Sequence, residues 1–149
     1  MRRIVVAALV FLAAVARAQA TAGVSCRAED ASAKLGLSAA FTRGLGGGLV
    51  NFGAALQILA EAPPDLRALQ FERSEVSLVW FYGRDLKFQL HRERPSDGPP
   101  GYVDLVIETR QSREDESLYR GTYVLNINYR QDQRERSLAL RGRVQCYVE

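Results

Sequence analysis

Residue types that build metal and nucleophilic sites are scarce in this chain of 149 residues, which has two cysteines and one histidine. Cys26 and Cys146 lie too far apart to form a Cys-x-x-Cys motif, and His91 has no second imidazole with which to hold a metal. The chain also lacks the Gly-x-Ser-x-Gly motif of a serine hydrolase. We therefore predict no catalytic residue, no metal site and no cofactor.

Two other segments suggest sites but lack the required spacing. Residues 44–48, Gly-Leu-Gly-Gly-Gly, match neither the dinucleotide fingerprint nor the phosphate-binding loop with its lysine, so we expect a loop or a bent strand. Glu114, Asp115 and Glu116 lack the ligand rhythm of a calcium loop and favour a solvated hairpin loop. Glycosidase carboxylates are recognised by their separation in space, and none of the 17 acidic residues stands out in the sequence.

No apolar run is long enough to cross a bilayer as a helix. The longest, residues 4–15, would rise roughly 18 Å, against a hydrocarbon core of ~30 Å. It follows Arg2 and Arg3 and precedes Ala18-Gln19-Ala20, the small-residue pattern that signal peptidase cleaves. We predict that residues 1–20 are a signal peptide cleaved after Ala20. Residues 21–149 would then be a single β-rich domain, periplasmic or extracellular, without a stable membrane anchor.

An excess of one sign of charge is missing from the predicted mature chain. The full sequence has 20 basic and 17 acidic side chains, a formal net charge of +3 and a pI of about 9.1. The predicted signal peptide contains Arg2, Arg3 and Arg17 and no acidic residue, so the remainder is formally neutral. Net charge therefore gives no reason to expect nucleic acid or an anionic membrane as the partner.

The two cysteines fit an oxidising compartment. Cys26 and Cys146 lie near the two ends of the predicted mature chain. An even pair of cysteines in an exported protein predicts a disulfide, which here would join the terminal regions. Closing a loop of about 120 residues stabilises a fold by roughly 4–5 kcal/mol in the chain-entropy model. We favour this structural bridge over a redox site.

Alternation of apolar and polar residues with a period of two dominates from residue 76 onward. Residues 76–82, the turn 83–85 and the alternating run 86–91 predict a hairpin with His91 on its polar face. We expect the turn 83–85 and the loop 111–117 to share one end of the sheet. Three later runs each place their apolar residues on one face: Val103, Leu105 and Ile107; Tyr119, Gly121, Tyr123, Leu125, Ile127 and Tyr129; Leu138, Leu140, Gly142, Val144 and Cys146.

The first half of the chain has weaker patterns. Residues 34–42 and 66–73 favour strands. Residues 51–62 suit a helix that Asn51 would cap and two prolines would end, but the preceding glycines and Gly53 favour a strand. The sequence therefore predicts an all-β, single-domain antiparallel sandwich or barrel of about seven or eight strands, with its termini joined by a disulfide.

Aromatic residues supply the candidate binding sites. Such residues usually pack in the core, but in a barrel Trp80, Tyr82, Tyr119 and Tyr123 would line a pocket for a small apolar ligand. The outward faces of other predicted strands carry Tyr102, Arg141, Arg143 and Tyr147. An exposed group of tyrosines and arginines is typical of a protein-binding surface, and these four are our second candidate site.

Three functions remain open at this point. A signal peptide, a compact β-domain and one disulfide resemble small periplasmic proteins such as bacterial lysozyme inhibitors in architecture, without a shared motif. The leading hypothesis is an exported, non-catalytic binding module, lysozyme-inhibitor-like or directed at another envelope or extracellular protein. The alternatives are a β-barrel carrier of a small apolar ligand and a hydrolase that uses two carboxylates.

Overall fold

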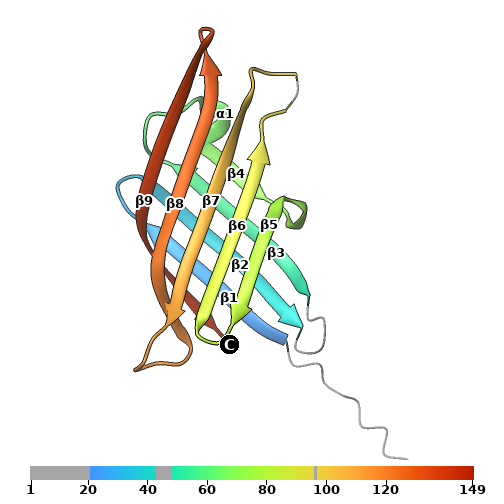
Figure 1. The fold of residues 1–149 in the computed structure, drawn as a ribbon, viewed down its shortest axis with the longest axis vertical. Coiled ribbons are helices and arrows are strands. Elements are labelled where there is room, and N and C mark those ends of the chain that lie inside the picture. The colour runs from blue at the N-terminus through green and yellow to red at the C-terminus, as the bar shows by residue number, and fades with distance from the viewer. Residues whose placement is uncertain (1–20, 43–47, 96) are drawn as a thin grey trace, which may run out of the picture.

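The computed structural model describes residues 21–42, 48–95 and 97–149, which form one antiparallel sheet of nine strands curled into a nearly closed barrel (Figure 1). The predicted all-β class is confirmed, with more strands than expected. The predicted signal peptide, residues 1–20, and most of the glycine run, residues 44–47, lie outside the described residues. No helix in the described part of the chain is long and apolar enough to cross a membrane.

The strands follow one another around the barrel with a single break. Their order in the sheet is β4-β3-β2-β1-β9-β8-β7-β6-β5, so the first and last strands pair while the consecutive strands β4 and β5 do not. The elements are β1 Thr21–Glu29, β2 Ala33–Thr42, β3 Leu49–Ile58, α1 Pro64–Arg67, β4 Ala68–Phe71, the short 3-10 helix η1 Arg73–Glu75, β5 Val76–Tyr82, β6 Asp85–Glu93, β7 Gly101–Gln111, β8 Leu118–Gln131 and β9 Arg134–Val148.

The first half of the chain differs most from the sequence predictions. The ambiguous segment 51–62 is a strand as far as Ile58, as we favoured. The predicted strand 66–73 is only partly correct, because α1 occupies its start and β4 covers Ala68–Phe71 alone. Strand β1 was not foreseen, and it accounts for the additional strand. Its inward residues include two alanines, Ala22 and Ala28, so its apolar alternation is weak.

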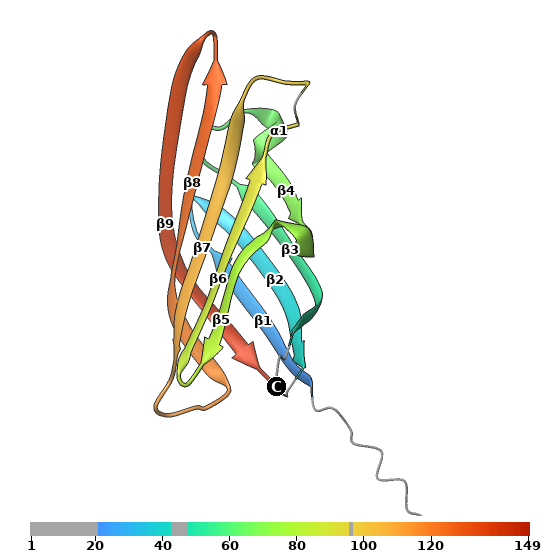
Figure 2. The same ribbon diagram turned by 45° about the vertical axis from the view of Figure 1, so that its right-hand side comes forward.

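The core lies inside the barrel and receives side chains from all the strands. The faces predicted for β7, β8 and β9 are confirmed: Val103, Leu105, Ile107, Leu125 and Ile127 have no exposed surface. Three residues of the same faces, Tyr129, Leu138 and Leu140, are only partly buried. They lie toward the hairpin of β8 and β9, which extends beyond the other strands at one end of the barrel (Figure 2). Alternation therefore predicted the direction of these side chains correctly, but not the extent of their burial.

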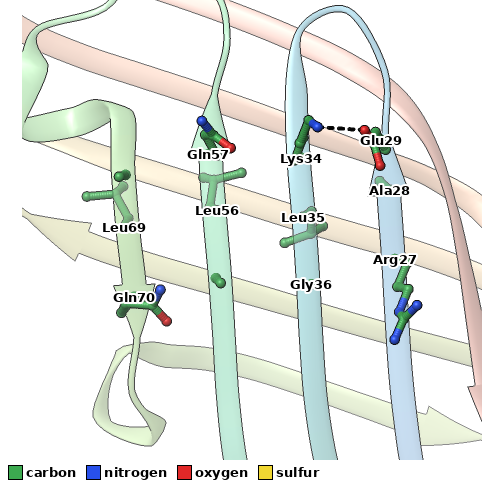
Figure 3. A pocket seen from close by; sticks show the side chains of 12 residues that line it. Arg27, Ala28, Glu29, Lys34, Leu35, Gly36, Leu56, Gln57, Leu69 and Gln70 are labelled. Carbon is green, nitrogen blue, oxygen red and sulfur yellow. Dashed lines mark ion pairs between the residues drawn. The ribbon is translucent and has the colours of Figure 1, made fainter.

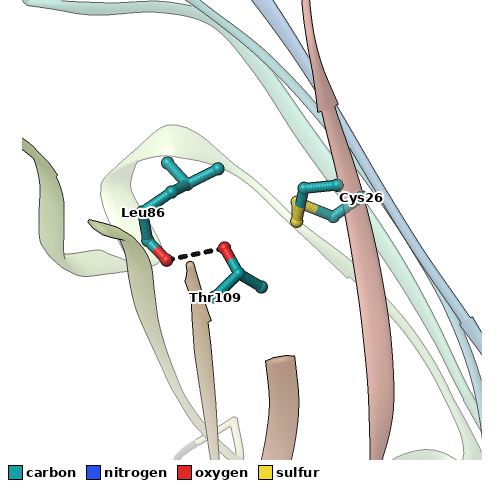
Figure 4. The surroundings of a disulfide bond; sticks show 4 residues. Cys26, Leu86 and Thr109 are labelled. Atoms are coloured by element: carbon teal, nitrogen blue, oxygen red, sulfur yellow. Dashed lines mark hydrogen bonds between the residues drawn. A yellow bond between two sulfur atoms is a disulfide. The ribbon is translucent and has the colours of Figure 1, made fainter. Parts of the chain in front are cut away.

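The predicted disulfide is confirmed, and it joins strands β1 and β9. Cys26 lies directly opposite Cys146, and their Sγ atoms are 2.06 Å apart. Both cysteines are fully buried beside the interior residues Leu86 and Thr109 (Figure 4). The Thr109 hydroxyl donates a hydrogen bond of 2.9 Å to the Leu86 carbonyl oxygen, which satisfies this buried polar group. Because β1 and β9 pair over only four residues each, the disulfide reinforces a short backbone junction between the two halves of the chain.

The turn 83–85 and the loop 111–117 share one end of the barrel, as predicted. The Gln111 amide donates a hydrogen bond of 2.8 Å to the Arg84 carbonyl oxygen. The Arg84 guanidinium donates one of 2.7 Å to the carbonyl oxygen of Gln111. These reciprocal bonds link the β5–β6 turn directly to the end of β7.

Side chains bridge the break between β4 and β5, which we call the seam. On one half of the seam, β6 extends past β5, and Arg92 donates a hydrogen bond to the Gln70 carbonyl oxygen of β4. Arg94 makes two hydrogen bonds to the carboxylate of Asp65 in α1, of 2.7 and 2.8 Å. On the other half, the aromatic ring of Phe81 in β5 packs 5.3 Å from that of Phe41 in β2. Side chains thus connect the two sides of the seam, while the backbone edges of β4 and β5 are not paired with each other.

Candidate functional site

The four aromatic residues proposed to line an interior pocket are divided between the two sides of the sheet. Tyr119 and Tyr123 face inward and are buried. Trp80 and Tyr82 face outward, with 49% and 76% of their surfaces exposed. The expectation that Trp80 and Tyr82 lie inside the barrel is therefore wrong.

Strand register explains this difference. Strand β5 is apolar on both faces, so alternation alone does not indicate which face is buried. Pairing with β6 sets Phe81 opposite the fully buried Leu86, and Val79 opposite the fully buried Phe88. Phe81 and Val79 therefore turn inward, and Trp80 turns outward. The short turn Gly83–Arg84 was the sequence signal that could have identified this register.

The interior tyrosine Tyr123 has a structural partner. Its hydroxyl donates a hydrogen bond of 2.7 Å to Asp30 Oδ2, and this bond is the main reason that the pKa of Asp30 is lowered. Burial, followed by the bond to Asp30, raises the pKa of Tyr123. Gly142 lies directly opposite Tyr123, and a Cβ there would collide with the Tyr123 ring and the Asp30 carboxylate. The glycine therefore makes room for the tyrosine, not for a ligand.

Gly121, on the same inward face of β8, is also required by a local contact between strands. It lies opposite Thr109, and a Cβ on Gly121 would collide with the backbone of Glu108. Only glycine permits this close approach of β7 and β8. The neighbouring interior is filled by aromatic rings, with Phe81 6.0 Å from Tyr119. The four aromatic residues proposed as pocket lining therefore do not line one interior pocket: two face outward, and two pack against other side chains.

The described hollows lie outside this aromatic cluster. One of about 550 Å³ lies over the β1–β4 part of the sheet, where Gly36 has Arg27 and Ala55 as its direct neighbours. Figure 3 shows the ion pair of Lys34 with Glu29, which is 2.7 Å long. Another, of about 580 Å³, lies beside the seam and is lined by Arg92 and Arg94 among others. The described residues contain no group of three or more His, Cys, Asp or Glu side chains placed to hold a metal ion.

The second candidate site, Tyr102 with Arg141, Arg143 and Tyr147, does not form one surface. Through β8, Tyr102 is in register with Asn128, whereas Tyr147 is opposite Leu118. About ten residues of β8, or roughly 33 Å, separate the two tyrosines along the strand direction. Arg141, Arg143 and Tyr147 do share the outer face of β9. The two arginines therefore share a surface with Tyr147 but not with Tyr102.

Tyr102 instead neighbours the only histidine. The rings of His91 and Tyr102 have centroids 5.7 Å apart, and His91 Nδ1 lies 2.7 Å from Asp104 Oδ1. Hydrogen bonding to Asp104 is the main cause that raises the pKa of His91, and Glu93 adds to it. His91 is on the polar, outward face, as predicted. His91 therefore contacts two carboxylates and a tyrosine, and these side chains form one polar cluster on the surface.

The outer face of β5 holds large exposed apolar residues that the sequence patterns placed inside the barrel or did not single out. Leu78 joins Trp80 and Tyr82 there, and the last two rings form an edge-to-face pair with centroids 6.0 Å apart. The structure thus creates a row of three large apolar side chains, which we call the β5 row, along one edge of the sheet.

Comparison of the chain with known protein families, with curated proteins and with solved structures finds no match in any of the three.

Proposed function

We propose that this protein is an exported, non-catalytic binding module that captures an extended segment of a partner protein along β5. The observation that carries the proposal is the coincidence of a free sheet edge with the β5 row of Leu78, Trp80 and Tyr82. An extended segment would add to the sheet as a further strand, and side chains on its outer face would contact the row.

The backbone of β5 is suited to such pairing. It hydrogen bonds to β6 on one side and has no strand neighbour on the other within residues 21–42, 48–95 and 97–149. Proteins usually protect an edge strand with charged residues, proline or a short length. Strand β5 has seven residues, Val-Ser-Leu-Val-Trp-Phe-Tyr, with neither a charge nor a proline. An unprotected edge of this kind is typical of a pairing site.

The β5 row supplies the apolar contact area. Six large hydrophobic residues in the described chain are exposed, and three of them are on this one strand. Tryptophan and tyrosine are the residue types most enriched among the energetically dominant residues of protein interfaces. A contiguous apolar patch at a sheet edge therefore favours protein binding over a solvated surface.

The Cys26–Cys146 disulfide supports the proposed export, since such bonds form and persist in oxidising compartments. The architectural resemblance to lysozyme inhibitors makes lysozyme one partner to test. We do not propose the carrier, because Trp80 and Tyr82 face outward and the inward Tyr119 and Tyr123 are engaged by Phe81 and Asp30. Nor do we propose the hydrolase: the pKa shifts resolved for carboxyl groups of the described residues are all downward, whereas a glycosidase general acid requires an upward shift.

Trp80 is the only tryptophan, so its fluorescence reports directly on the proposed site. The mature protein would be used to select binders from a library of displayed linear peptides, and lysozyme would be tested in parallel. We expect apolar, β-forming peptides whose binding shifts Trp80 emission to shorter wavelength. Replacing Trp80→Ala should weaken binding at least tenfold, because truncating a central interface residue typically costs 2 kcal/mol or more.

The matched control is Tyr102→Ala, which removes another exposed aromatic residue far from the β5 row. This variant should bind within twofold of the wild type. The proposal fails if ligands bind without changing Trp80 emission, or if Tyr102→Ala weakens binding as much as Trp80→Ala.

A further inference from the structure

We infer that a second surface of this protein binds an acidic polysaccharide. The surface, which we call the arginine face, consists of Arg27 on β1, Arg120 on β8, and Arg141 and Arg143 on β9, all exposed on the outside of the barrel. It does not depend on the β5 row or on the function proposed for that row.

Sheet register brings these four arginines together from three strands. Arg120 and Arg27 are the direct partners of Gln145 on its two sides, one on β8 and one on β1. Arg143 and Arg141 are the next two outward positions along β9. With strands about 4.8 Å apart and outward positions about 6.8 Å apart, the four Cα atoms lie within a patch of roughly 10 by 14 Å.

The charge of this patch is not neutralised by its neighbours. Within the described residues, none of the four arginines has a carboxylate oxygen within 4.0 Å. The outward carboxylates on the adjoining parts of β1, β6 and β7 are each held by a different cation. Those pairs are Glu29–Lys34 at 2.7 Å, Glu108–Lys87 at 3.0 Å and Asp85–Arg110 at 3.2 Å. These three acids are thus engaged elsewhere. Asp115, in the loop before β8, has its pKa lowered mainly by hydrogen bonds from Ser117 and to a smaller extent by the charge of Arg120. With four arginines and this one acid nearby, the arginine face keeps a net positive charge.

The residues between the arginines indicate which anion fits. Thr122, Gln145 and Ser25 are outward, uncharged positions that can exchange hydrogen bonds with hydroxyl groups. Tyr147, 48% exposed, lies two residues beyond Gln145 and offers a flat aromatic surface on which a sugar ring can stack. Arginine pairs in a bidentate manner with carboxylate and with similar planar or tetrahedral oxyanions. Apart from Val124, which lies opposite Arg141, the uncharged outward positions between the arginines are polar, and this polar character favours a polysaccharide over an acidic protein.

The disulfide lies directly beneath the arginine face. Cys26 precedes Arg27, and Cys146 lies between Gln145 and Tyr147, with both sulfur atoms on the inner side of the sheet. The bridge therefore holds Arg27 at a fixed distance from the arginines of β9. Such preorganisation lowers the conformational cost of binding an extended polyanion.

The test compares two double variants of equal net charge. Arg120→Gln/Arg143→Gln removes half of the arginine face, and Arg73→Gln/Arg134→Gln removes two exposed arginines elsewhere. Binding to heparin and to polygalacturonate is measured by calorimetry, with dextran as an uncharged polysaccharide. We expect at least a tenfold loss of affinity for the first variant, less than a twofold loss for the second, and no binding of dextran. Thermal unfolding by circular dichroism verifies that both variants fold.

Tyr147→Ala provides a readout that charge alone would not change. It should weaken polysaccharide binding several-fold while the dependence of affinity on salt concentration stays the same. Trp80→Ala should leave polysaccharide binding intact, so that failure of this inference is distinguishable from failure of the proposed function. Equal losses in the two double variants would overturn the inference, as would tighter binding to polyglutamate or to vesicles containing phosphatidylglycerol than to either acidic polysaccharide.

Discussion

Tyr123 connects distant parts of the chain through one hydroxyl group. It extends from β8 to Asp30, which also accepts hydrogen bonds from the backbone amides of Ser32 and Ala33 in the turn after β1. The ring fits because the opposite residue on β9 is Gly142. The sequence predicted that Tyr123 and Gly142 face inward, but their contact depends on strand register.

Replacing Tyr123→Phe should lower the free energy of unfolding by about 1–2 kcal/mol at pH 7, since it removes a hydrogen bond to a carboxylate. The pKa of Asp30 is lowered in the folded protein, so this bond stabilises the fold above the ordinary value of 3.8. The stabilisation is lost as the pH falls through the lower, folded-state pKa. The difference between wild type and variant should therefore shrink in acid.

Urea unfolding at pH 7 and near pH 3 measures this difference. Tyr129→Phe is the control, because Tyr129 is a partly buried tyrosine on the same face of β8. It should change stability by less than about 0.5 kcal/mol at both pH values. A pH-independent effect of Tyr123→Phe would contradict the role given to Asp30.

At the scale of elements, the seam between β4 and β5 is the unusual feature of the barrel. Arg94 closes one half of it through two hydrogen bonds to Asp65, and its side chain is only 8% exposed. This pairing raises the pKa of Arg94 and lowers that of Asp65. Residues 94–100 are polar and rich in proline and glycine, and nothing in their sequence links Arg94 to α1.

Arg94→Gln should destabilise the protein by about 1–3 kcal/mol, because it removes a charge-assisted, bidentate pair from a largely buried position. Hydrogen exchange should accelerate in α1 and β4 before it does in β7 and β8, which are paired on both sides. Arg130→Gln is the matched control, since its 3.3 Å pair with Glu135 is exposed and should contribute less than about 1 kcal/mol. Equal effects of the two variants would show that Arg94 does not hold the seam.

At the scale of the whole molecule, the disulfide and the β1–β9 pairing join the two ends of the chain. The cysteines are 120 residues apart in sequence, so the bridge restricts nearly the entire unfolded chain. Cys26→Ala/Cys146→Ala should therefore lower the free energy of unfolding by roughly 3–5 kcal/mol. Urea unfolding of the variant and of the reduced wild type measures the loss, which should be similar for both.

Intact mass spectrometry of the exported protein provides a separate check. Reduction should add two hydrogens, and the mature chain should begin at Thr21 if residues 1–20 are a signal peptide. Free thiols in the native protein, or a double variant as stable as the wild type, would contradict the structural role of the bridge.

Local patterns in the sequence determined the strand-rich class, the inward faces of β7, β8 and β9, and the disulfide, because side-chain alternation is local and only one cysteine pair exists. The tertiary structure decided which face of the doubly apolar β5 is buried and where the sheet has its free edges. It also gathered the arginines of β1, β8 and β9 into one charged face within a predicted mature chain that is formally neutral. The free edges and the arginine face depend on pairing between strands far apart in sequence, in particular β1 with β9, which no local alternation of side chains predicts. The buried face of β5 depends on its register with β6, because both faces of β5 are apolar.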